Sequence, residues 1–470
     1  MTGDEITLTS LRRCLRGGVP AIIATAAADG TPNVTYLSTV HLVDEERVAL
    51  SNQFFSKTSR NLAENPRASV LVTDPLTYDE YRLDLSFERT ERRGPLFESL
   101  RGEVDAVAAL SGMQEVFRLK AADVYRVTHI EAVLGGAARR GEPGLDVPAP
   151  MDAATAAARL AELSGRIARA ADLDVVVGTT VAGLDELLGY PHSLLALRDE
   201  RGERLYVIAS HGYETEGVGS ELAVGDGPIG LAAQRGAPVR IGAVKQMAKY
   251  GRTVRRSFEA GGFDPVREIP LPSLPDGESL VAVPAMASGQ LVGVLVVEST
   301  QPVAFDETDQ ALLSVVATLL ATAVEADRRL VDVSEGEGSG DQGLSTPPSA
   351  DADVVPPDGD GCIQVRCFGQ DGSVFLDGDY LIKGVAGRIL TALLRAHEAD
   401  GRVDFTNREL RLDPSLGLPE YRDNLESRLI LLKRRLDERA APVRIDKTGR
   451  GRFRLDVSTE VRVDVADFDG

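Results

Sequence analysis

The order of apolar and polar residues in the first part of the chain predicts β-strands around a short helix. Residues 32–42 (PNVTYLSTVHL) alternate with period two, as expected for a strand with one buried face. A helix is expected over residues 57–64, because the pair Asn65 and Pro66 then ends it. Further strands are expected at residues 20–27, 47–51 and 68–72. Short strands around one helix predict a small closed barrel.

Residues 150–330 show a different pattern, which predicts an α+β domain with antiparallel strands between two helices. Residues 154–171 carry apolar side chains at helical spacing. A long helix follows Phe305, with Asp306 expected as its N-cap and Asp309 as the capping-box partner. The expected strands are residues 193–198, 205–210, 279–286 and 291–298, with a turn-rich segment at 224–230.

The last part of the chain combines helices with a hairpin. A long helix is expected over residues 420–439, and residues 442–455 (PVRIDKTGRGRFRL) follow at once as a hairpin with Gly449 and Gly451 at its tip. A helix followed directly by a basic, glycine-tipped hairpin is typical of a winged helix. Other helices are expected at residues 385–397 and 407–410.

Two segments rich in glycine, proline and small residues divide the chain. Residues 331–361 contain eight acidic residues and no basic one, which predicts a flexible, self-repelling acidic linker. A second boundary is expected at residues 135–150. The resulting domains, 1–135, 150–330 and 362–470, each have the size of an ordinary folding unit. The predicted fold class is therefore multidomain α+β.

The composition is that of a soluble globular protein. Of the 470 residues, 43% are hydrophobic and 26% are charged. No run approaches the ~20 uninterrupted apolar residues of a membrane helix, and the first residues do not resemble a secretory signal. We therefore expect a cytoplasmic location.

Cysteine and histidine patterns give no case for a disulfide framework or a metal site. The three cysteines, Cys14, Cys362 and Cys367, are too few and too scattered for the former. Cys362 and Cys367 would lie on opposite faces of one strand, so we expect buried structural thiols. The five histidines form no HxxxH or HExxH motif, although a lone histidine could still ligate haem.

The net charge of −20 is unevenly distributed along the chain. Residues 361–470 contain 19 basic and 19 acidic residues, so the acidic excess lies upstream. Residues 422–454 contain eleven basic and five acidic residues. A local basic patch on an acidic protein suits a reader of double-stranded DNA.

The segment LSNQFFSKTSRNLAENPRASVLV, residues 50–72, resembles the FMN-binding split-barrel family typified by pyridoxamine 5'-phosphate oxidase. The resemblance covers residues 6–133. It implies that Ser51 and Asn52 lie at the flavin and that Lys57 and Thr58 lie at its phosphate. Hydroxyls, a lysine and a helix N-terminus together neutralise a phosphate dianion.

This segment departs from the family in its basic residues. Only Lys57 and Arg60 are near the expected phosphate, and no pyridoxamine-phosphate site is matched. FMN is the expected cofactor, and deazaflavin or haem, which other relatives of this barrel take, are the alternatives. A barrel that has lost its ligand also stays open.

The middle domain resembles a GAF domain, an α/β sandwich that senses small molecules. The resemblance rests on LYVIASHGYE from residue 205, VGDGPIGLAAQRGAPVRI from 224, VAVPAMASGQLVGVLVVES from 281 and FDETDQALLSVVATLLA from 305. This domain contains no cysteine, which excludes covalent bilin attachment. Either its pocket binds a small ligand or the domain is a dimerisation spacer.

The last domain resembles the winged-helix output domain of response regulators, through residues 421–455. The resemblance implies a recognition helix with an early exposed part facing base edges and nearby phosphates, a later part contacting the DNA backbone, and a wing near the minor groove. These DNA-contacting positions are Arg422, Asn424, Ser427 and Arg428, then Lys433, Arg434 and Arg435, and on the wing Lys447, Arg450 and Arg452.

Together these features predict a cytoplasmic, homodimeric transcription regulator that senses a redox state or small ligand and binds DNA. No receiver domain precedes the output domain, so the two upstream domains are expected to supply the input. Docking or release of the DNA-binding domains is one way in which the signal could act. The alternatives are a flavin-dependent oxidoreductase regulated by its later domains and a protein-interaction scaffold. No clear acid–base pair lies beside the expected flavin edge, which favours a sensor over an enzyme.

Overall fold

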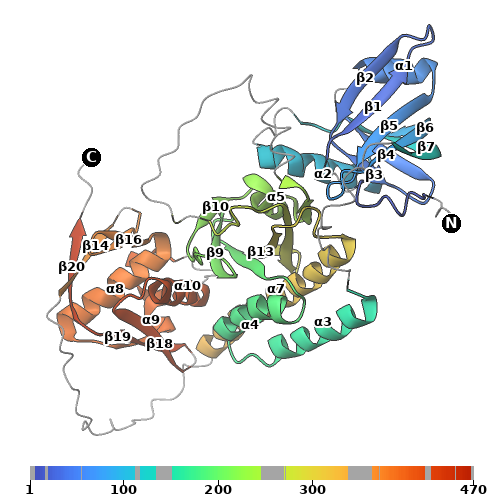
Figure 1. The fold of residues 1–470 in the computed structure, drawn as a ribbon. Helices are drawn as coiled ribbons and strands as arrows, with labels where there is room; N and C mark the ends of the chain where they lie inside the picture. The colour runs from blue at the N-terminus through green and yellow to red at the C-terminus, as the bar shows by residue number, and fades with distance from the viewer. Residues whose placement is uncertain are drawn as a thin grey trace.

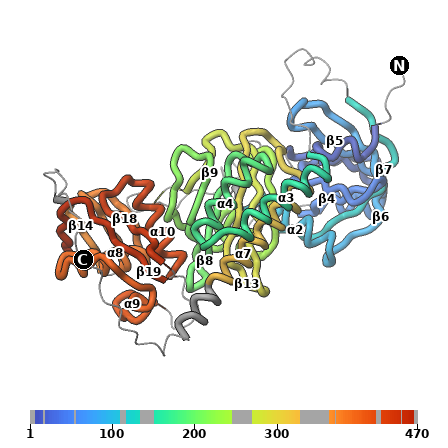
Figure 2. The backbone as a smooth tube through the Cα atoms, turned by 90° about the horizontal axis from the view of Figure 1, so that it is seen from below, coloured from blue at the N-terminus to red at the C-terminus, as the bar shows by residue number. Residues whose placement is uncertain are grey.

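The computed structural model shows three folded domains, with the middle one lying between the other two (Figures 1 and 2). The structure describes residues 6–15, 19–53, 56–111, 117–133, 151–244, 269, 271–336, 362–369, 371–418, 425–449 and 451–466. Residues 337–361, most of the predicted acidic linker, lie outside this description, as does the boundary at 134–150.

The first domain is a curled, antiparallel sheet of seven strands in the order β2-β1-β5-β6-β7-β4-β3. Ser38 and Thr39 interrupt the expected strand over 32–42, because the chain crosses there from β2 at one edge of the sheet to β3 at the other. The elements are β1 (Ala21–Ala26), β2 (Pro32–Leu37), β3 (Val40–Leu42), β4 (Arg47–Asn52), α1 (Ser56–Glu64), β5 (Arg67–Thr73), β6 (Glu80–Glu91), α2 (Pro95–Ser111) and β7 (Ala121–Val133).

The expectation of a single helix in this domain is wrong, because α2 is a second one. Ala106 and Ala109 of α2 lie in one buried cluster with residues of the middle domain, such as Ile229 and Val294. The barrel has its own core, which includes Ile23 and Leu83. The helix α2 therefore joins the first domain to the second.

The middle domain has a six-stranded antiparallel sheet in the order β10-β9-β8-β13-β12-β11, with helices on both faces. The helices α3, α4 and α7 cover one face through residues such as Leu163, Leu184 and Leu320, and α5 packs on the other together with α2. The elements are α3 (Ala153–Ala168), α4 (Leu173–Glu186), β8 (His192–Arg198), β9 (Arg204–His211), β10 (Glu221–Ala223), α5 (Gly227–Arg235), β11 (Val239–Ile241), β12 (Ser279–Ala287), β13 (Gln290–Ser299) and α7 (Glu307–Gly336).

Two helices of this domain were not predicted. The expected helix over 154–171 ends near its predicted end, and Asp172 then caps α4 by accepting a hydrogen bond from the backbone N–H of Val175 (3.0 Å). The turn-rich segment 224–230 leads directly into α5, which has a proline in its first turn. The predicted layout of strands between two helices therefore undercounts the helices.

The expected cap of α7 is confirmed, because Asp306 accepts from the backbone N–H of Thr308 and of Asp309 while the Asp309 carboxylate accepts from Asp306 N (2.7 Å). The helix runs to Gly336, so the first residues of the predicted linker 331–361 are helical. In the described part of the chain, one segment, Glu307–Asp327, is long and apolar enough to cross a membrane by length and composition alone. Its residues Leu313 and Leu320 are fully buried in the core of the middle domain, as in the core helix of a globular domain.

The C-terminal domain has helices between two small sheets, ordered β16-β15-β14-β20 and β17-β19-β18. The expected helix 420–439 is seen as α10 from Leu425, since residues 419–424 lie outside the described part. The elements are β14 (Cys362–Phe368), β15 (Val374–Leu376), β16 (Asp379–Ile382), α8 (Gly384–Asp400), β17 (Asp404–Thr406), α9 (Asn407–Leu412), a 3-10 turn (Pro414–Leu416), α10 (Leu425–Glu438), β18 (Val443–Gly449), β19 (Arg452–Val457) and β20 (Glu460–Ala466).

Candidate functional site

The strand end that was expected to meet a flavin forms a buried polar network. Ser51, at the end of β4, is 1% exposed, and its Oγ lies 3.1 Å from Ser38 Oγ. It also accepts a hydrogen bond from the backbone N–H of Thr39 (3.3 Å). Gln53 Nε2 donates to Ser38 Oγ, whereas Gln53 Oε1 is buried and finds no partner among the described residues. Ser51 thus fixes the crossing between β2 and β3.

Asn52 and Thr58, two of the other expected flavin residues, help to hold α1 against the barrel. Asn52 Nδ2 donates to the carboxylate of Asp123 on β7 (2.8 Å). The Thr58 hydroxyl, 2% exposed, accepts from Asn33 Nδ2 on β2 (3.0 Å). The side chain of Lys57 is exposed in the same turn of α1. The structure therefore brings Ser51, Asn52, Lys57 and Thr58 to one end of the barrel, and Lys57 reaches solvent there.

The strand β2 beside this region presents an apolar surface. Val34 and Tyr36 are 64% and 62% exposed, although β2 is an edge strand of the sheet. Exposed apolar side chains on an edge strand are typical of a surface that a ligand or another chain covers. No pattern in the sequence distinguished this face from the buried one.

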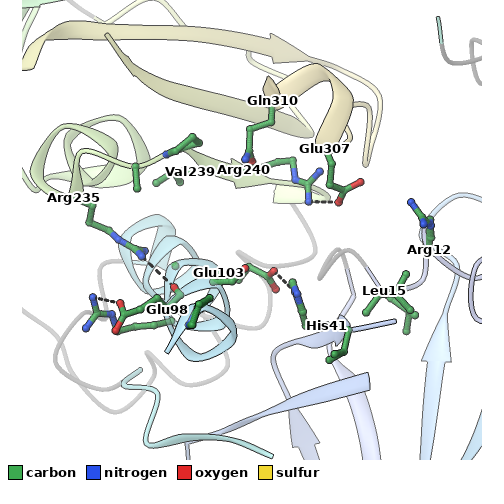
Figure 3. A pocket seen from close by; sticks show the side chains of 18 of the residues that line it. Arg12, Leu15, His41, Glu98, Glu103, Arg235, Val239, Arg240, Glu307 and Gln310 are labelled. Atoms are coloured by element: carbon green, nitrogen blue, oxygen red, sulfur yellow. Dashed lines mark hydrogen bonds and ion pairs between the residues drawn. The ribbon is translucent and has the colours of Figure 1, made fainter. Parts of the chain in front are cut away.

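A cleft of about 1090 Å³ separates the first domain from the middle one (Figure 3). On the barrel side, His41 Nδ1 lies 2.7 Å from the carboxylate of Glu103 on α2. Burial alone would lower the pKa of His41, but the hydrogen bond and charge of Glu103 outweigh it and raise that pKa. On the opposite side, Arg240 pairs with Glu307 (2.7 Å). The charges of this cleft are therefore largely neutralised in pairs.

The position of α2 along this cleft depends on a glycine. A Cβ at Gly102 would lie 2.8 Å from Nη1 of Arg235, so the missing side chain leaves room for the guanidinium. Arg235, on α5, has its Nη1 3.6 Å from the carboxylate of Asp105 on α2. This contact ties α5 of the middle domain to α2.

A group of buried titratable side chains lies near one edge of the middle domain. Tyr213 stacks edge-on with His192 at 5.8 Å, and Glu298 accepts from the backbone N–H of Leu274 (3.1 Å). Burial raises the pKa of Glu298, and burial together with the charge of Glu298 raises that of Tyr213. Because these residues come from separate strands and loops, spacing in the sequence gave no signal for them.

Cys14 and Cys367 are buried thiols, whereas the side chain of Cys362 lies outside the described part. Cys14 and Cys367 make no disulfide. Burial raises the pKa of the Cys14 thiol to about 12, which keeps it protonated and unreactive. Within the described residues, no group of three or more histidine, cysteine or acidic side chains could hold a metal ion.

The helix α10 lies against the middle domain in both views of the chain (Figures 1 and 2). Arg428 is 8% exposed and forms two hydrogen bonds with the carboxylate of Glu200, at 2.7 and 3.0 Å. Its guanidinium also lies over the ring of Tyr206 on β9, 3.9 Å from the ring centre. A stacked, bidentate guanidinium is among the stronger polar contacts that proteins make.

Two more cations of α10 share one acid of the middle domain. Lys433 Nζ and Arg434 Nε each lie 2.9 Å from the carboxylate of Asp174 in the first turn of α4. Burial would raise the pKa of Asp174, but Lys433 and Arg434 lower it overall. Arg435 instead turns into its own domain, where Nε donates to the carbonyl of Leu381 (2.9 Å).

The expectation that Ser427 and Arg428 lie on an exposed part of the helix is therefore wrong for this conformation. Ser427 is 2% exposed, because α10 is covered by its own domain on one side and by the middle domain on the other. Arg422 and Asn424 lie outside the described residues, so their placement stays a prediction.

The hairpin β18–β19 has both paired and exposed cations. Lys447 Nζ lies 2.6 Å from the carboxylate of Glu426 on α10 and 3.7 Å from that of Asp172 in the middle domain. The side chain of Arg452 is exposed. Arg450 lies outside the described residues. The cations of α10 and of the hairpin contact three acids of the middle domain, Asp172, Asp174 and Glu200. These acids could not be found from the sequence, because more than 200 residues separate them from their partners.

Comparison with known proteins identifies the first two domains. Residues 9–128 match the family model of pyridoxamine 5'-phosphate oxidase, and residues 170–325 match that of the GAF domain. The chain therefore contains a split barrel of the FMN-binding type followed by a GAF domain. No curated protein matches the chain. The resemblances inferred for these two domains are confirmed, and the inference for the C-terminal domain stays a prediction.

Several solved structures are similar to parts of this chain. The GAF domain of a phosphoenolpyruvate-protein phosphotransferase from Coxiella burnetii is 19% identical, with 38% of this chain and 98% of that chain covered and a TM-score of 0.31. The free methionine-R-sulfoxide reductase from Neisseria meningitidis is 24% identical, with 40% and 98% covered and a TM-score of 0.31. An FMN-binding protein from Syntrophomonas wolfei is 19% identical, with 26% and 82% covered and a TM-score of 0.23.

Proposed function

We propose that this protein is a transcription regulator whose C-terminal domain binds double-stranded DNA in response to a signal received by the barrel and the GAF domain. The observation that carries the proposal is the order of elements in the C-terminal domain. The helices α8, α9 and α10 are followed by the hairpin β18–β19, with the short strand β17 completing its sheet. This is the outline of a winged helix, in which α10 would be the recognition helix and the hairpin the wing.

The placement of basic residues supports the same assignment. Arg428, Lys433 and Arg434 project from α10 beyond its own domain, and Arg452 is exposed on the hairpin. Cations on a recognition helix and its wing contact phosphates and base edges. A DNA-binding regulator of this kind would work in the cytoplasm.

DNA binding can be tested with the full chain and a labelled pool of random duplexes of about 30 base pairs, long enough for two half-sites. We expect saturable binding, with a logarithm of the binding constant that falls linearly with the logarithm of the salt concentration. Arg452→Ala should reduce the steepness of this line by about one. Arg462→Ala, an exposed arginine on β20, is the matched control and should leave the slope unchanged. Absence of binding at every salt concentration, in the wild type and in a variant with α10 released from the GAF domain, would refute this function.

The proposed input of the barrel is a flavin, with FMN as the first candidate. Lys57 would pair with the phosphate, Gln53 Oε1 is a buried acceptor without a described partner, and Val34 and Tyr36 offer an apolar surface. These residues fit a group that has an anionic end and a flat apolar ring. A bound flavin would supply a redox-active centre, and the protein would supply its binding and orientation.

An absorption spectrum of the purified protein before and after dithionite tests this input. A flavin band that bleaches on reduction supports it, whereas a Soret band would assign haem instead. A protein that stays colourless after incubation with FMN and with deazaflavin would leave the GAF pocket as the input.

The exposed strand β2 supports a homodimer. A second copy of the chain would cover Val34 and Tyr36 and pair with the free edge of the sheet. Light scattering should give twice the mass of the chain, and Tyr36→Glu should shift it toward the monomer. A monomeric wild type at micromolar concentration would contradict this arrangement.

A further inference from the structure

The outward face of α10, which the proposed function assigns to DNA, is covered in this structure. Within the described length of the helix, Leu425–Glu438, Asp437 is the one exposed residue. Residues such as Leu432 and Leu436 pack into the core of the C-terminal domain, and the remaining face contacts β9 and α4 of the GAF domain. A recognition helix needs an open face to enter the major groove. DNA and the GAF domain therefore cannot occupy α10 together.

The GAF domain meets α10 with acids at the places where a DNA backbone would offer phosphates. We call Asp172, Asp174 and Glu200 the acidic dock. Glu200 holds Arg428, Asp174 holds Lys433 and Arg434, and Asp172 lies 3.7 Å from Lys447 of the hairpin. All four cations belong to the set that is expected to contact DNA. A carboxylate that accepts two hydrogen bonds from one guanidinium reproduces the geometry of an arginine–phosphate contact.

The contact is specific in shape as well as in charge. The side chains of Arg428 and Glu200 are only 9% and 13% exposed, and Arg428 is stacked on Tyr206. The guanidinium of Arg434 lies beside Gly178 on α4 and also donates a hydrogen bond to the backbone carbonyl of Asp174 (3.1 Å). The carboxylate of Glu438 also accepts a hydrogen bond from the backbone N–H of Gly217 (3.0 Å). Removing one partner of such a buried, hydrogen-bonded pair costs more than breaking a solvent-exposed pair, because the other charge is left buried and unpaired.

We infer that the acidic dock is a DNA-mimicking surface that holds the C-terminal domain in a form unable to bind DNA. The inference rests on the proposed function and names how that function is regulated. The GAF domain and DNA compete for the same four cations, so a signal that weakens the dock raises DNA affinity. In the absence of the signal, full-length protein is held mainly in the docked form.

The dock is placed where the GAF domain can alter it. Tyr206 lies on β9, and the neighbouring residues Leu205 and Val207 of that strand belong to the buried cluster on the opposite face of the sheet. Ala106 and Ala109 of α2 belong to this same cluster. A ligand in the GAF domain or a movement of the barrel that repacks this cluster would therefore shift β9, which carries the ring of Tyr206 on which Arg428 is stacked.

The test compares DNA binding by full-length variants. Asp174→Asn with Glu200→Gln removes two charges of the dock and leaves every predicted DNA contact intact. Glu214→Gln with Asp226→Asn removes two exposed charges of the same domain and is the matched control. At about 0.15 M salt, we expect the dock variant to bind the random duplex pool at least tenfold more tightly than wild type, and the control to stay within twofold of it.

A second measurement keeps the inference separate from the proposed function. Hydrogen exchange of the α10 amides should become faster in the dock variant than in wild type and should not change in the control. If the double variant proves unstable, Asp174→Asn alone replaces it, because this substitution leaves the buried pair of Arg428 and Glu200 in place. It should give the same changes in DNA affinity and in exchange of the α10 amides, but smaller ones.

The outcomes are distinct. Faster exchange without DNA binding in any variant would support the dock and refute DNA binding as the function. Equal DNA affinity of the wild type and the dock variant, with α10 exchange unchanged, would refute the dock. Tighter DNA binding together with faster exchange in the dock variant alone supports both.

Discussion

Arg428 of α10 and Glu200, in the turn between β8 and β9, form a two-bond ion pair across the boundary between two domains, although 228 residues separate them in the chain. The pair is nearly closed to solvent and is covered on one side by the ring of Tyr206. A guanidinium desolvated to this extent depends on its counter-charge. The contact between the C-terminal domain and the GAF domain therefore combines this buried ion pair with an apolar cluster that the two domains share.

Removing one partner of this pair should be costly. Glu200→Ala leaves Arg428 in a buried position without a counter-charge, and we expect the docked arrangement to lose about 3 kcal/mol. The loss would be read from hydrogen exchange of α10. Replacing both residues by methionine should recover part of it, since no unpaired charge then remains. Glu162→Ala removes the partner of a solvent-exposed arginine and should have little effect; an equal loss in this control would contradict the prediction.

The stability of the first two domains should fall as the pH rises through the raised pKa of His41. The pKa of His41 is higher in the folded protein than its ordinary value of 6.5, because of Glu103. The stabilisation that the pair of His41 and Glu103 gives the fold is fully present below the pKa of histidine in the unfolded chain. It is lost as the pH rises through the pKa of His41 in the folded protein. Thermal unfolding from pH 5.5 to 8.5 should show this decline in the wild type and not in His41→Gln. His129→Gln, at an exposed position on β7, should behave as the wild type.

Two glycine-to-alanine substitutions in helices should have opposite effects. A Cβ at Gly387 of α8 would lie 1.9 Å from the carbonyl oxygen of Gly372, so Gly387→Ala should destabilise the C-terminal domain by about 2 kcal/mol. In α3, a Cβ at Gly165 would meet only the flexible end of Arg169. There alanine should stabilise by about 0.5–1 kcal/mol through helix propensity. Denaturant unfolding distinguishes the two, and stabilisation by both substitutions would show that α8 does not approach Gly372 this closely.

The role of Lys57 can be separated from that of the barrel as a whole. If this residue pairs with a phosphate, Lys57→Ala should weaken FMN binding about tenfold, as expected for loss of one charge-assisted hydrogen bond. The affinity for riboflavin, which has the same ring system and no phosphate, should stay the same. Arg67→Ala, at an exposed position on β5, serves as the control for a general change in charge. Equal weakening for both ligands would place Lys57 away from the phosphate.

The strands and long helices of this chain could be predicted because their patterns are local. The alternation in residues 32–37 and the capping box of Asp306 and Asp309 were both read from neighbouring residues. The helix α4 was missed because its three consecutive valines, Val175 to Val177, favour a strand. In the folded protein the Asp172 cap and burial of Val176 and Val177 against the sheet override that preference.

The candidate sites were less accessible to prediction. The sequence placed Lys57 and Thr58 together, but only the fold shows that Thr58 is buried against Asn33. In the same way, Arg428 was assigned to an exposed face because its domain resembles a winged helix. Its burial depends on another domain whose placement no local pattern encodes.

The position of Ala106 and Ala109 on α2 has a consequence for where this chain can be divided. In sequence they belong to the barrel, but they fill part of the core beneath the GAF sheet. A gene rearrangement that cut the chain between the two domains would leave an apolar gap in one and an uncovered helix in the other. The two domains therefore cannot be separated at this boundary without exposing apolar surface on both, and a substitution on α2 alters the packing of both.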